Sequence, residues 1–232
     1  MKFLFLLLLS TAAHAQVSHL SPVLINGEFP EADEFPEVVQ VFGQDQRGRW
    51  SCTATIIGSR VVMTAAHCVG EHMGELQMAD GTALQCEQHP IYDAGNQDAD
   101  IALCVAKKKF EVVPAVLAKE PMAVGDQVQL SGYGCTNSNR QGAGALRVGF
   151  SHAVEIPAQD GFYFETFGQA ALCFGDSGGP AFVESEDDRH VVAGVNSRGN
   201  IKDYSLMTAV WTDPIKSFIR RFEKHYRVRV AR

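Results

Sequence analysis

The segment that most constrains this chain is Cys173–Pro180, which reads Cys-Phe-Gly-Asp-Ser-Gly-Gly-Pro. Its glycines permit backbone conformations with positive φ and leave no side chains in the way of an approaching molecule. Such a backbone can expose the hydroxyl of Ser177 and direct the N–H groups of Gly175 and Ser177 at one point, where a developing oxyanion would be stabilised. The alternative is a glycine-rich turn between two strands, and this segment alone does not decide between the two.

A serine hydroxyl is a weak nucleophile, so a catalytic Ser177 needs a base, and the base needs an acid that orients it. Upstream, the apolar run Val62–Ala66 ends at His67 and Cys68. Histidine is the side chain whose ordinary charge change falls near neutral pH. His67 is therefore the candidate general base.

Between these segments, Asp100 directly precedes the apolar run Ile101–Leu103. Asp98 and Asp93 are alternatives for the orienting acid. We prefer Asp100 because the buried strand expected after it would keep its carboxylate out of water, where it could accept from the second imidazole nitrogen of His67.

The segments TAAHC (64–68), DIAL (100–103) and GDSGGP (175–180) together resemble the chymotrypsin-like (trypsin-like, S1) family of serine endopeptidases. The order His, Asp, Ser along the chain distinguishes this family from other folds that carry the same residue types. The resemblance extends from about Leu24 to the C-terminus. It implies an all-β fold of two antiparallel six-stranded β-barrels with a C-terminal α-helix, and an endopeptidase that forms an acyl-enzyme and needs no cofactor or metal.

The resemblance also implies an activation ion pair. A freed α-amine at Leu24 would fold inward and pair with Asp176, and removing one partner of a buried pair costs about 3–5 kcal/mol. Residue 23 is Val rather than Lys or Arg. A trypsin-like activating protease is therefore not expected, and self-activation stays open.

The specificity pocket implied by the resemblance contains no acidic residue. Ala171 would form its floor, Leu172, Gly199 and Ser205 its walls, and Ser197 would lie beside the carboxylate of Asp100. These residues predict cleavage after small or medium apolar residues.

Two departures from the family pattern affect this pocket. Arg198 replaces the usual Trp, and the usual Cys of the following loop is missing, with Asn200–Tyr204 in its place. A shifted loop could bring the carboxylate of Asp203 into the pocket, which would favour basic residues instead.

The chain has 232 residues, 46% of them hydrophobic, and a formal net charge of −7. This charge gives no indication of nucleic-acid binding. Lys2, the apolar run Phe3–Leu9 and the small residues around Ala15 predict a signal peptide over residues 1–15 and export of a soluble product, extracellular or periplasmic. A short propeptide over residues 16–23 and a peptidase domain over residues 24–232 would follow.

Six cysteines in an exported chain predict three disulfides, of which fifteen pairings are possible. The resemblance pairs Cys52 with Cys68. We pair the others provisionally as Cys86 with Cys104 and Cys135 with Cys173. Metal binding is the competing interpretation, but no Cys-x-x-Cys or paired His spacing supports it.

Short apolar runs punctuated by Gly, Asn and Asp predict strands, with a first barrel over about residues 24–115, a crossover over 106–126 and a second barrel over about 125–210. The expected strands are Val38–Phe42, Trp50–Ile57, Arg60–Thr64, Thr82–Cys86, Ile101–Val105, Gln127–Gly132, Leu146–Val154, Gly161–Glu165, Pro180–Val183, Val191–Ser197 and Leu206–Val210. One convincing helix, over about 213–226, is expected to be capped by Asp213 and to pack its apolar stripe against the second barrel.

Polypeptide substrates, protein protease inhibitors as partners and a monomeric state follow as expectations, with no nucleic-acid or membrane partner. Three other functions stay open at this stage. They are an inactive homologue used as a binding or regulatory module, a disulfide-stabilised surface adhesin, and an esterase on the same fold.

Overall fold

The structure is a computed structural model, and it describes residues 24–232 except 47, 71–74, 94 and 186–188. Its strands are formed by segments in which apolar residues either alternate with polar ones or follow one another without interruption. The side chain of Asp93 is also outside the described part. The predicted signal peptide (1–15) and propeptide (16–23) lie outside the described residues. Within the described part, no helix has the length and apolar character needed to cross a membrane.

The first half of the chain forms a closed antiparallel barrel with the strand order β1-β2-β3-β6-β5-β4. Its strands are β1 (Val38–Asp45), β2 (Gly48–Gly58), β3 (Val61–Thr64), β4 (Glu75–Met78), β5 (Ala83–Gln88) and β6 (Ala102–Ala106). β4 was not predicted from the sequence, and its side chains alternate between exposed and buried. β3 is buried at all four positions, since it lies between β2 and β6.

The second half forms another barrel, with the order β11-β8-β9-β10-β13-β12 and closure by pairing of β11 with β12. Its strands are β8 (Gln127–Gly132), β9 (Arg147–Glu155), β10 (Tyr163–Phe167), β11 (Pro180–Val183), β12 (Val191–Gly199) and β13 (Tyr204–Ala209). The crossover contains β7 (Val116–Leu117), which pairs in parallel with β12. The prediction of two six-stranded barrels is confirmed.

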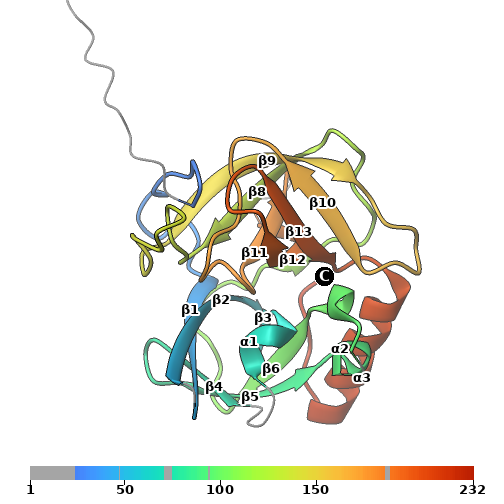
Figure 1. The fold of residues 1–232 in the computed structure, drawn as a ribbon. Helices are drawn as coiled ribbons and strands as arrows, with labels where there is room; N and C mark the ends of the chain where they lie inside the picture. The colour runs from blue at the N-terminus through green and yellow to red at the C-terminus, as the bar shows by residue number, and fades with distance from the viewer. Residues whose placement is uncertain (1–23, 47, 71–74, 94, 186–188) are drawn as a thin grey trace, which may run out of the picture.

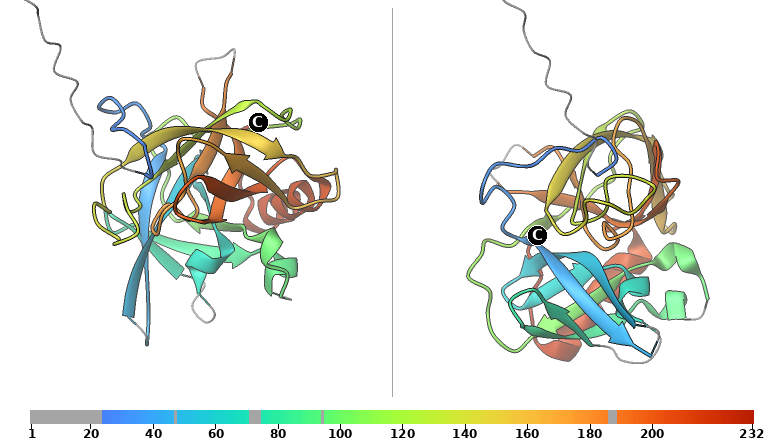
Figure 2. Two further views of the ribbon diagram at one scale, coloured as in Figure 1. Left: turned by 45° about the horizontal axis from the view of Figure 1, so that its top comes forward. Right: turned by 60° about the vertical axis from the view of Figure 1, so that its left-hand side comes forward.

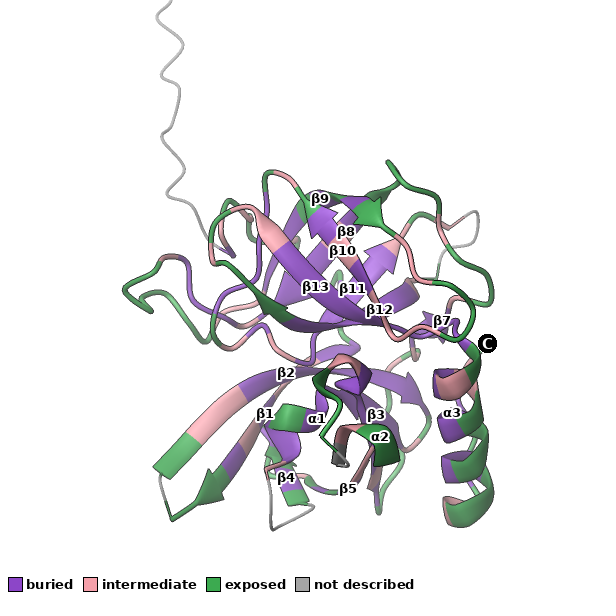
Figure 3. Ribbon diagram, turned by 45° about the vertical axis from the view of Figure 1, so that its right-hand side comes forward, coloured by how far each residue is buried: buried purple, intermediate pink, exposed green. Residues whose placement is uncertain are grey.

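The two barrels lie one above the other, and the views of Figures 1 and 2 agree on this arrangement. Figure 3 shows that the strands of both barrels are mostly buried where the barrels face each other. Hydrogen bonds cross the contact, including one from the backbone N–H of Thr53 to the carbonyl of Ser177, at 2.8 Å. The candidate catalytic segments lie along this contact.

The C-terminal helix α3 (Asp213–Tyr226) has the predicted bounds, but two expectations about it were wrong. Its N-cap is Thr212, which makes no side-chain capping bond, so Asp213 lies inside the first turn. The helix packs against β6 and the core of the first barrel rather than against the second. Phe218 contacts His89 of the first barrel edge to face, with ring centroids 5.0 Å apart.

Three short helical segments were not predicted, and each of them carries a candidate residue. They are α1 (Ala66–Val69), α2 (Pro90–Asp93) and the 3₁₀ helix η1 (Gln97–Ala99). The three expected disulfides are present in the pairs Cys52–Cys68, Cys86–Cys104 and Cys135–Cys173. The first joins β2 to α1, and the third joins the loop after β8 to the segment before Ser177.

Candidate active site

His67 lies in α1, immediately after β3 brings the chain to the contact between the barrels. The Cys52–Cys68 disulfide fixes the next residue, and the indole nitrogen of Trp50 donates to the carbonyl of Cys68 at 2.8 Å. The imidazole is 37% exposed. The backbone of this histidine is thus held firmly while its ring stays accessible to a substrate.

Asp100 is buried, and three groups donate hydrogen bonds to its carboxylate. His67 donates through Nδ1 to Oδ2 at 2.7 Å and through its backbone N–H to Oδ1 at 3.0 Å. The hydroxyl of Ser197 donates to Oδ2 at 2.6 Å. Burial alone would raise the pKa of Asp100, but these hydrogen bonds and the charge of His67 together lower it. This carboxylate is therefore ionised at neutral pH.

Residues of the second barrel hold the turn that presents Asp100. Arg198 donates to the carboxylate of Asp98 at 2.7 Å and to the carbonyl of Gln97 at 3.1 Å. The hydroxyl of Thr208 donates to the carbonyl of Asp100 at 3.1 Å. Asp98, one alternative for the orienting acid, is thus paired with Arg198 at the surface and makes no bond to His67 among the described contacts.

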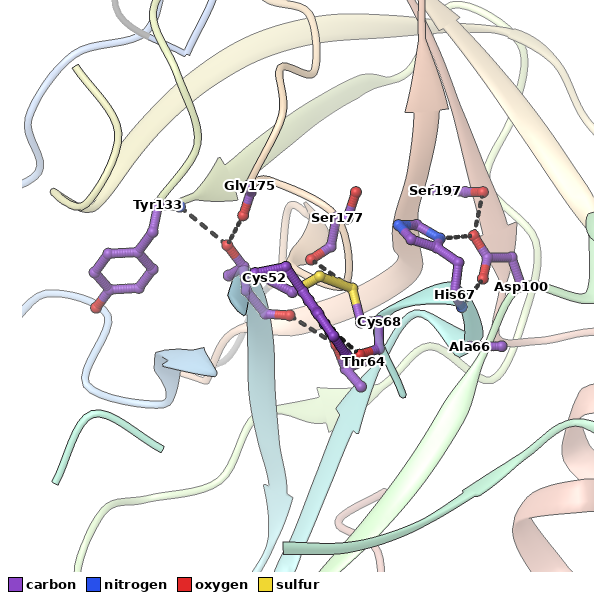
Figure 4. Close-up of a disulfide and its surroundings, with 12 residues drawn as sticks. Cys52, Thr64, Ala66, His67, Cys68, Asp100, Tyr133, Gly175, Ser177 and Ser197 are labelled. Carbon is purple, nitrogen blue, oxygen red and sulfur yellow. Dashed lines mark hydrogen bonds and ion pairs between the residues drawn. A yellow bond between two sulfur atoms is a disulfide. The ribbon is translucent and has the colours of Figure 1, made fainter. Parts of the chain in front are cut away.

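Ser177 is half-buried in the tight segment between Cys173 and β11. Gly178 has φ +84°, and a Cβ there would lie 2.0 Å from the hydroxyl oxygen of Thr64, so only glycine fits. Figure 4 shows the imidazole of His67 between Ser177 and Asp100, above the Cys52–Cys68 disulfide. The described hydrogen bonds include none from Ser177 Oγ to His67. Such bonds are often long in structures without substrate and tighten when substrate binds.

Two backbone amides beside Ser177 are available to a ligand. Within the described contacts, the N–H groups of Gly175 and Ser177 donate to no protein acceptor. Thr53 of β2 holds this loop, because its hydroxyl donates to the carbonyl of Gly175 at 2.7 Å and accepts from the N–H of Tyr133 at 3.0 Å. Thr53 is fully buried, and it was not among the predicted site residues because no sequence motif contains it.

Asp176 is fully buried behind this loop. Its carboxylate accepts from the N–H groups of Gly134 at 2.8 Å and Cys173 at 2.9 Å. Burial raises its pKa to about 7, although these two hydrogen bonds and the charge of Arg147 act in the opposite direction. In this uncleaved chain the nitrogen of Leu24 belongs to a peptide bond, and the structure forms no ion pair between the two residues.

The predicted pocket residues lie close together in the second barrel. Ala171 is fully buried and its N–H donates to the carbonyl of Ile25 at 3.2 Å. Ser205 is also fully buried and accepts from the N–H of Leu172 at 3.0 Å. Gly199 pairs with Ser205 across β12 and β13.

The carboxylate of Asp203 is engaged within its own turn. It accepts from the side-chain amide of Asn200 at 2.7 Å and lies 3.6 Å from the ammonium of Lys202.

One group of residue types in the described part could in principle hold a metal ion, namely Cys52, His67 and Cys68. The two cysteines are joined in a disulfide, and a metal requires thiolates. These residues therefore do not form a ligand set.

Comparisons with known proteins show the family of this chain. A family model described as trypsin matches residues 24–213. The chain is 28% identical to trypsin eta of Drosophila melanogaster, over 64% of this chain and 67% of that protein. It is 25% identical to beta-fibrinogenase mucrofibrase-4 of Protobothrops mucrosquamatus, over 92% and 93%, and 25% identical to cathepsin G of Mus musculus, over 88% of each.

Proposed function

This chain belongs to the trypsin family of serine endopeptidases, and from that membership we propose that it is an exported enzyme that cleaves polypeptides through Ser177, His67 and Asp100. The observation that carries this proposal is the chain of contacts at the site. The imidazole of His67 is hydrogen-bonded at Nδ1 to a buried Asp100 carboxylate and faces Ser177, beside two amides that donate to no acceptor among the described residues.

In the first half of the reaction, Ser177 Oγ attacks the carbonyl carbon of the scissile peptide bond while Nε2 of His67 takes the hydroxyl proton. The carbonyl oxygen becomes an oxyanion that accepts from the N–H groups of Gly175 and Ser177. Asp100 keeps the Nδ1 proton in place and stabilises the imidazolium. His67 then gives its proton to the leaving amine, the C–N bond breaks, and an ester to Ser177 remains.

In the second half, a water molecule takes the place of the amine. His67 removes one of its protons as its oxygen attacks the ester carbonyl, and the same two amides hold the second oxyanion. The bond to Ser177 Oγ breaks, and the proton returns from His67 to that oxygen. The product is a free carboxylic acid and the enzyme is restored, so no cofactor is consumed.

The experiment that tests this function is labelling with a fluorophosphonate, followed by intact mass and peptide mapping. We expect one adduct on the oxidised, folded protein, located on Ser177, and none after prior unfolding. A folded protein with three disulfides and a freed α-amine at Leu24 that takes up no adduct would contradict the proposal.

The residues around the pocket support cleavage after small or medium apolar residues. The floor position Ala171 carries no charge, and the acid of the following loop, Asp203, is bonded to Asn200 and Lys202. A guanidinium entering such a pocket would lose its hydration without gaining a carboxylate.

We therefore expect kcat/KM for matched peptides with Leu or Ala before the scissile bond to exceed that for Arg by on the order of 10², since buried polar groups left unpaired discriminate strongly. A Phe peptide tests how large a side chain the pocket admits. The control is Asp203→Asn, which is expected to leave the ratio unchanged. A preference for Arg that disappears in this variant would instead place the Asp203 carboxylate in the pocket.

Export and processing belong to the same proposal. The N-terminal Lys2 and the apolar run Phe3–Leu9 support a signal peptide, and three disulfides fit an oxidising compartment. Removal of residues 1–15 and cleavage between Val23 and Leu24 would give the mature chain. Polypeptide substrates, and protein inhibitors that occupy the same site, are the partners we expect of a monomeric enzyme.

A further inference from the structure

In the uncleaved chain, the carboxylate of Asp176 is buried without a nearby ion-pair partner among the described residues. The carboxylate is fully buried, and within the described residues no ion pair of 4.0 Å or less includes it. Two backbone N–H groups bind it, from Gly134 and Cys173. Burying an ionised carboxylate is costly unless positive charge compensates it. The family's solution, an α-amine at residue 24, does not exist before the bond between Val23 and Leu24 is cleaved.

The segment after that bond is nevertheless already in position. Leu24 is fully buried in the core of the second barrel, and Ile25 pairs with Ala171. Glu28 pairs with Val148 of β9. The segment therefore packs against the second barrel without a free amine, and any positive charge near Asp176 in the uncleaved chain belongs to another residue.

Arg147 occupies the suitable place. It is the residue of β9 directly opposite Gly132 of β8, and the carboxylate of Asp176 lies against that glycine, where a Cβ would be 2.3 Å from Oδ1. Arg147 is only 6% exposed. Its guanidinium donates to the carbonyls of Gly142 at 2.6 Å and Ala145 at 3.3 Å and lies 4.6 Å from the ring centroid of Phe29.

Burying an arginine costs free energy unless its charge is compensated and its N–H groups find hydrogen-bond acceptors. Nε of Arg147 is buried and has no hydrogen-bond partner in the described part of the chain. Burial lowers the pKa of Arg147 and the charge of Asp176 opposes this, while the charge of Arg147 lowers the pKa of Asp176. Each group thus stabilises the charged form of the other through the strand pair β8–β9.

We propose that Arg147 is the internal positive charge that favours the ionised form of Asp176 in the uncleaved chain, so that the Gly175–Ser177 loop forms an oxyanion hole without cleavage before Leu24. This proposal rests on the proposed function. Arg147 is a positioning residue and touches no reacting atom. An ionised Asp176 binds the amides of Gly134 and Cys173 more strongly than a neutral acid does. One of these bonds fixes Cys173, two residues before the loop, and the other joins Asp176 to Gly134 after β8.

The test uses the full chain with the recognition sequence of a site-specific protease placed directly before Leu24. Each variant is then measured uncleaved and with the α-amine of Leu24 freed. The readout is the second-order rate of labelling by a fluorophosphonate. In the uncleaved form, Arg147→Gln is expected to be labelled about 10²-fold more slowly than the parent, comparable to the loss of an oxyanion-hole donor. Arg147→Lys restores most of the rate.

Comparing the labelling rates before and after cleavage distinguishes an electrostatic role of Arg147 from a general contribution to the stability of the fold. After cleavage the freed ammonium supplies a second positive charge, so the deficit of Arg147→Gln is expected to shrink to a few-fold. The control is Arg221→Gln, which removes an exposed arginine of α3 and is expected to be labelled at the parent's rate in both forms. Parental labelling of uncleaved Arg147→Gln, or an equal deficit in both forms, would overturn the proposal.

Two further outcomes are distinguishable. A parent labelled only after cleavage would overturn the proposal while leaving the proposed function intact. A parent labelled in neither form would overturn the proposed function itself.

Urea unfolding provides a second test. It does not require catalytic activity, and it can be carried out even if a single variant is destabilised. Urea unfolding midpoints of the parent, Arg147→Gln, Asp176→Asn and the double variant form a double-mutant cycle. Removing Arg147 is expected to lower the midpoint far less when Asp176 is already neutral. Additive losses would show that the two charges are not coupled, and the proposal would fall.

Discussion

Replacing Ser177 by alanine is expected to lower kcat by on the order of 10⁶ while the protein still folds and is exported, because the members of a triad act as a unit. The substitution removes one oxygen atom, and with it the atom that forms the acyl-enzyme. The described contacts assign no structural hydrogen bond to that hydroxyl. The Ser177 carbonyl, which accepts from Thr53, is kept. The loss is therefore expected in catalysis rather than in folding.

The measurement is hydrolysis of the preferred peptide by parent and Ser177→Ala protein at equal concentrations of folded material. Intact mass verifies the three disulfides, and circular dichroism verifies the strand content. Ser59→Ala provides the matched control, because Ser59 is an exposed serine in the turn between β2 and β3. Residual hydrolysis near the parental rate would remove Ser177 from the mechanism, and equal loss in the control would point to an effect on folding.

Most strand positions were predictable because strand periodicity and turn residues recur along both halves of the chain, and the two-barrel architecture was predicted from the family resemblance. The missed strand β4 reads Glu-Leu-Gln-Met, which contains no β-branched or aromatic residue, so its alternating burial follows from barrel closure rather than from intrinsic preference. The helix α1 has four residues and no side-chain cap, and so gives no sequence signal. The packing of α3 on the first barrel depends on the direction in which the chain leaves β13. The sequence of the helix itself does not determine that direction.

In the candidate site, the residues expected to react were predictable from the sequence, whereas the residues that hold them in place were not. The residues expected to react lie in segments whose composition is restricted by close packing, and such segments are recognisable in sequence. Thr53 and Arg198 hold those segments through contacts with positions between 80 and 122 residues away, and the role proposed for Arg147 acts across a strand pair. A buried threonine beside a cysteine and an arginine on a strand have no distinctive local pattern. Only the three-dimensional arrangement reveals what they do.

Replacing Asp100 by asparagine is expected to lower kcat by about 10⁴, the size of effect that the equivalent change has in a well-studied serine protease. The three donors around this carboxylate explain why. Oδ2 accepts from Nδ1 of His67 and from the hydroxyl of Ser197, and Oδ1 accepts from the backbone N–H of His67. An asparagine has one oxygen and one NH₂ group, so either orientation brings two donors together at one of these positions.

The less disruptive orientation turns the NH₂ group toward the imidazole and makes Nδ1 the acceptor. The ring proton then moves to Nε2, the atom that must accept the proton of Ser177, and the base is lost. The neutral amide also cannot stabilise the imidazolium of the transition state. Because the pKa of Asp100 is lowered, the parent enzyme keeps this carboxylate ionised throughout the neutral range. The deficit of the variant is therefore expected to persist across that range.

Asp98→Asn is the matched control, because it makes the same chemical change two residues away. The side chain of Asp98 is 39% exposed and is paired with Arg198. Loss of an exposed pair of this kind costs about 1 kcal/mol or less, so the expected effect on kcat is at most a few-fold. If Asp98→Asn caused the large loss and Asp100→Asn the small one, Asp98 would be the orienting acid. If the two losses were equal, the turn of η1 would matter more than either carboxylate.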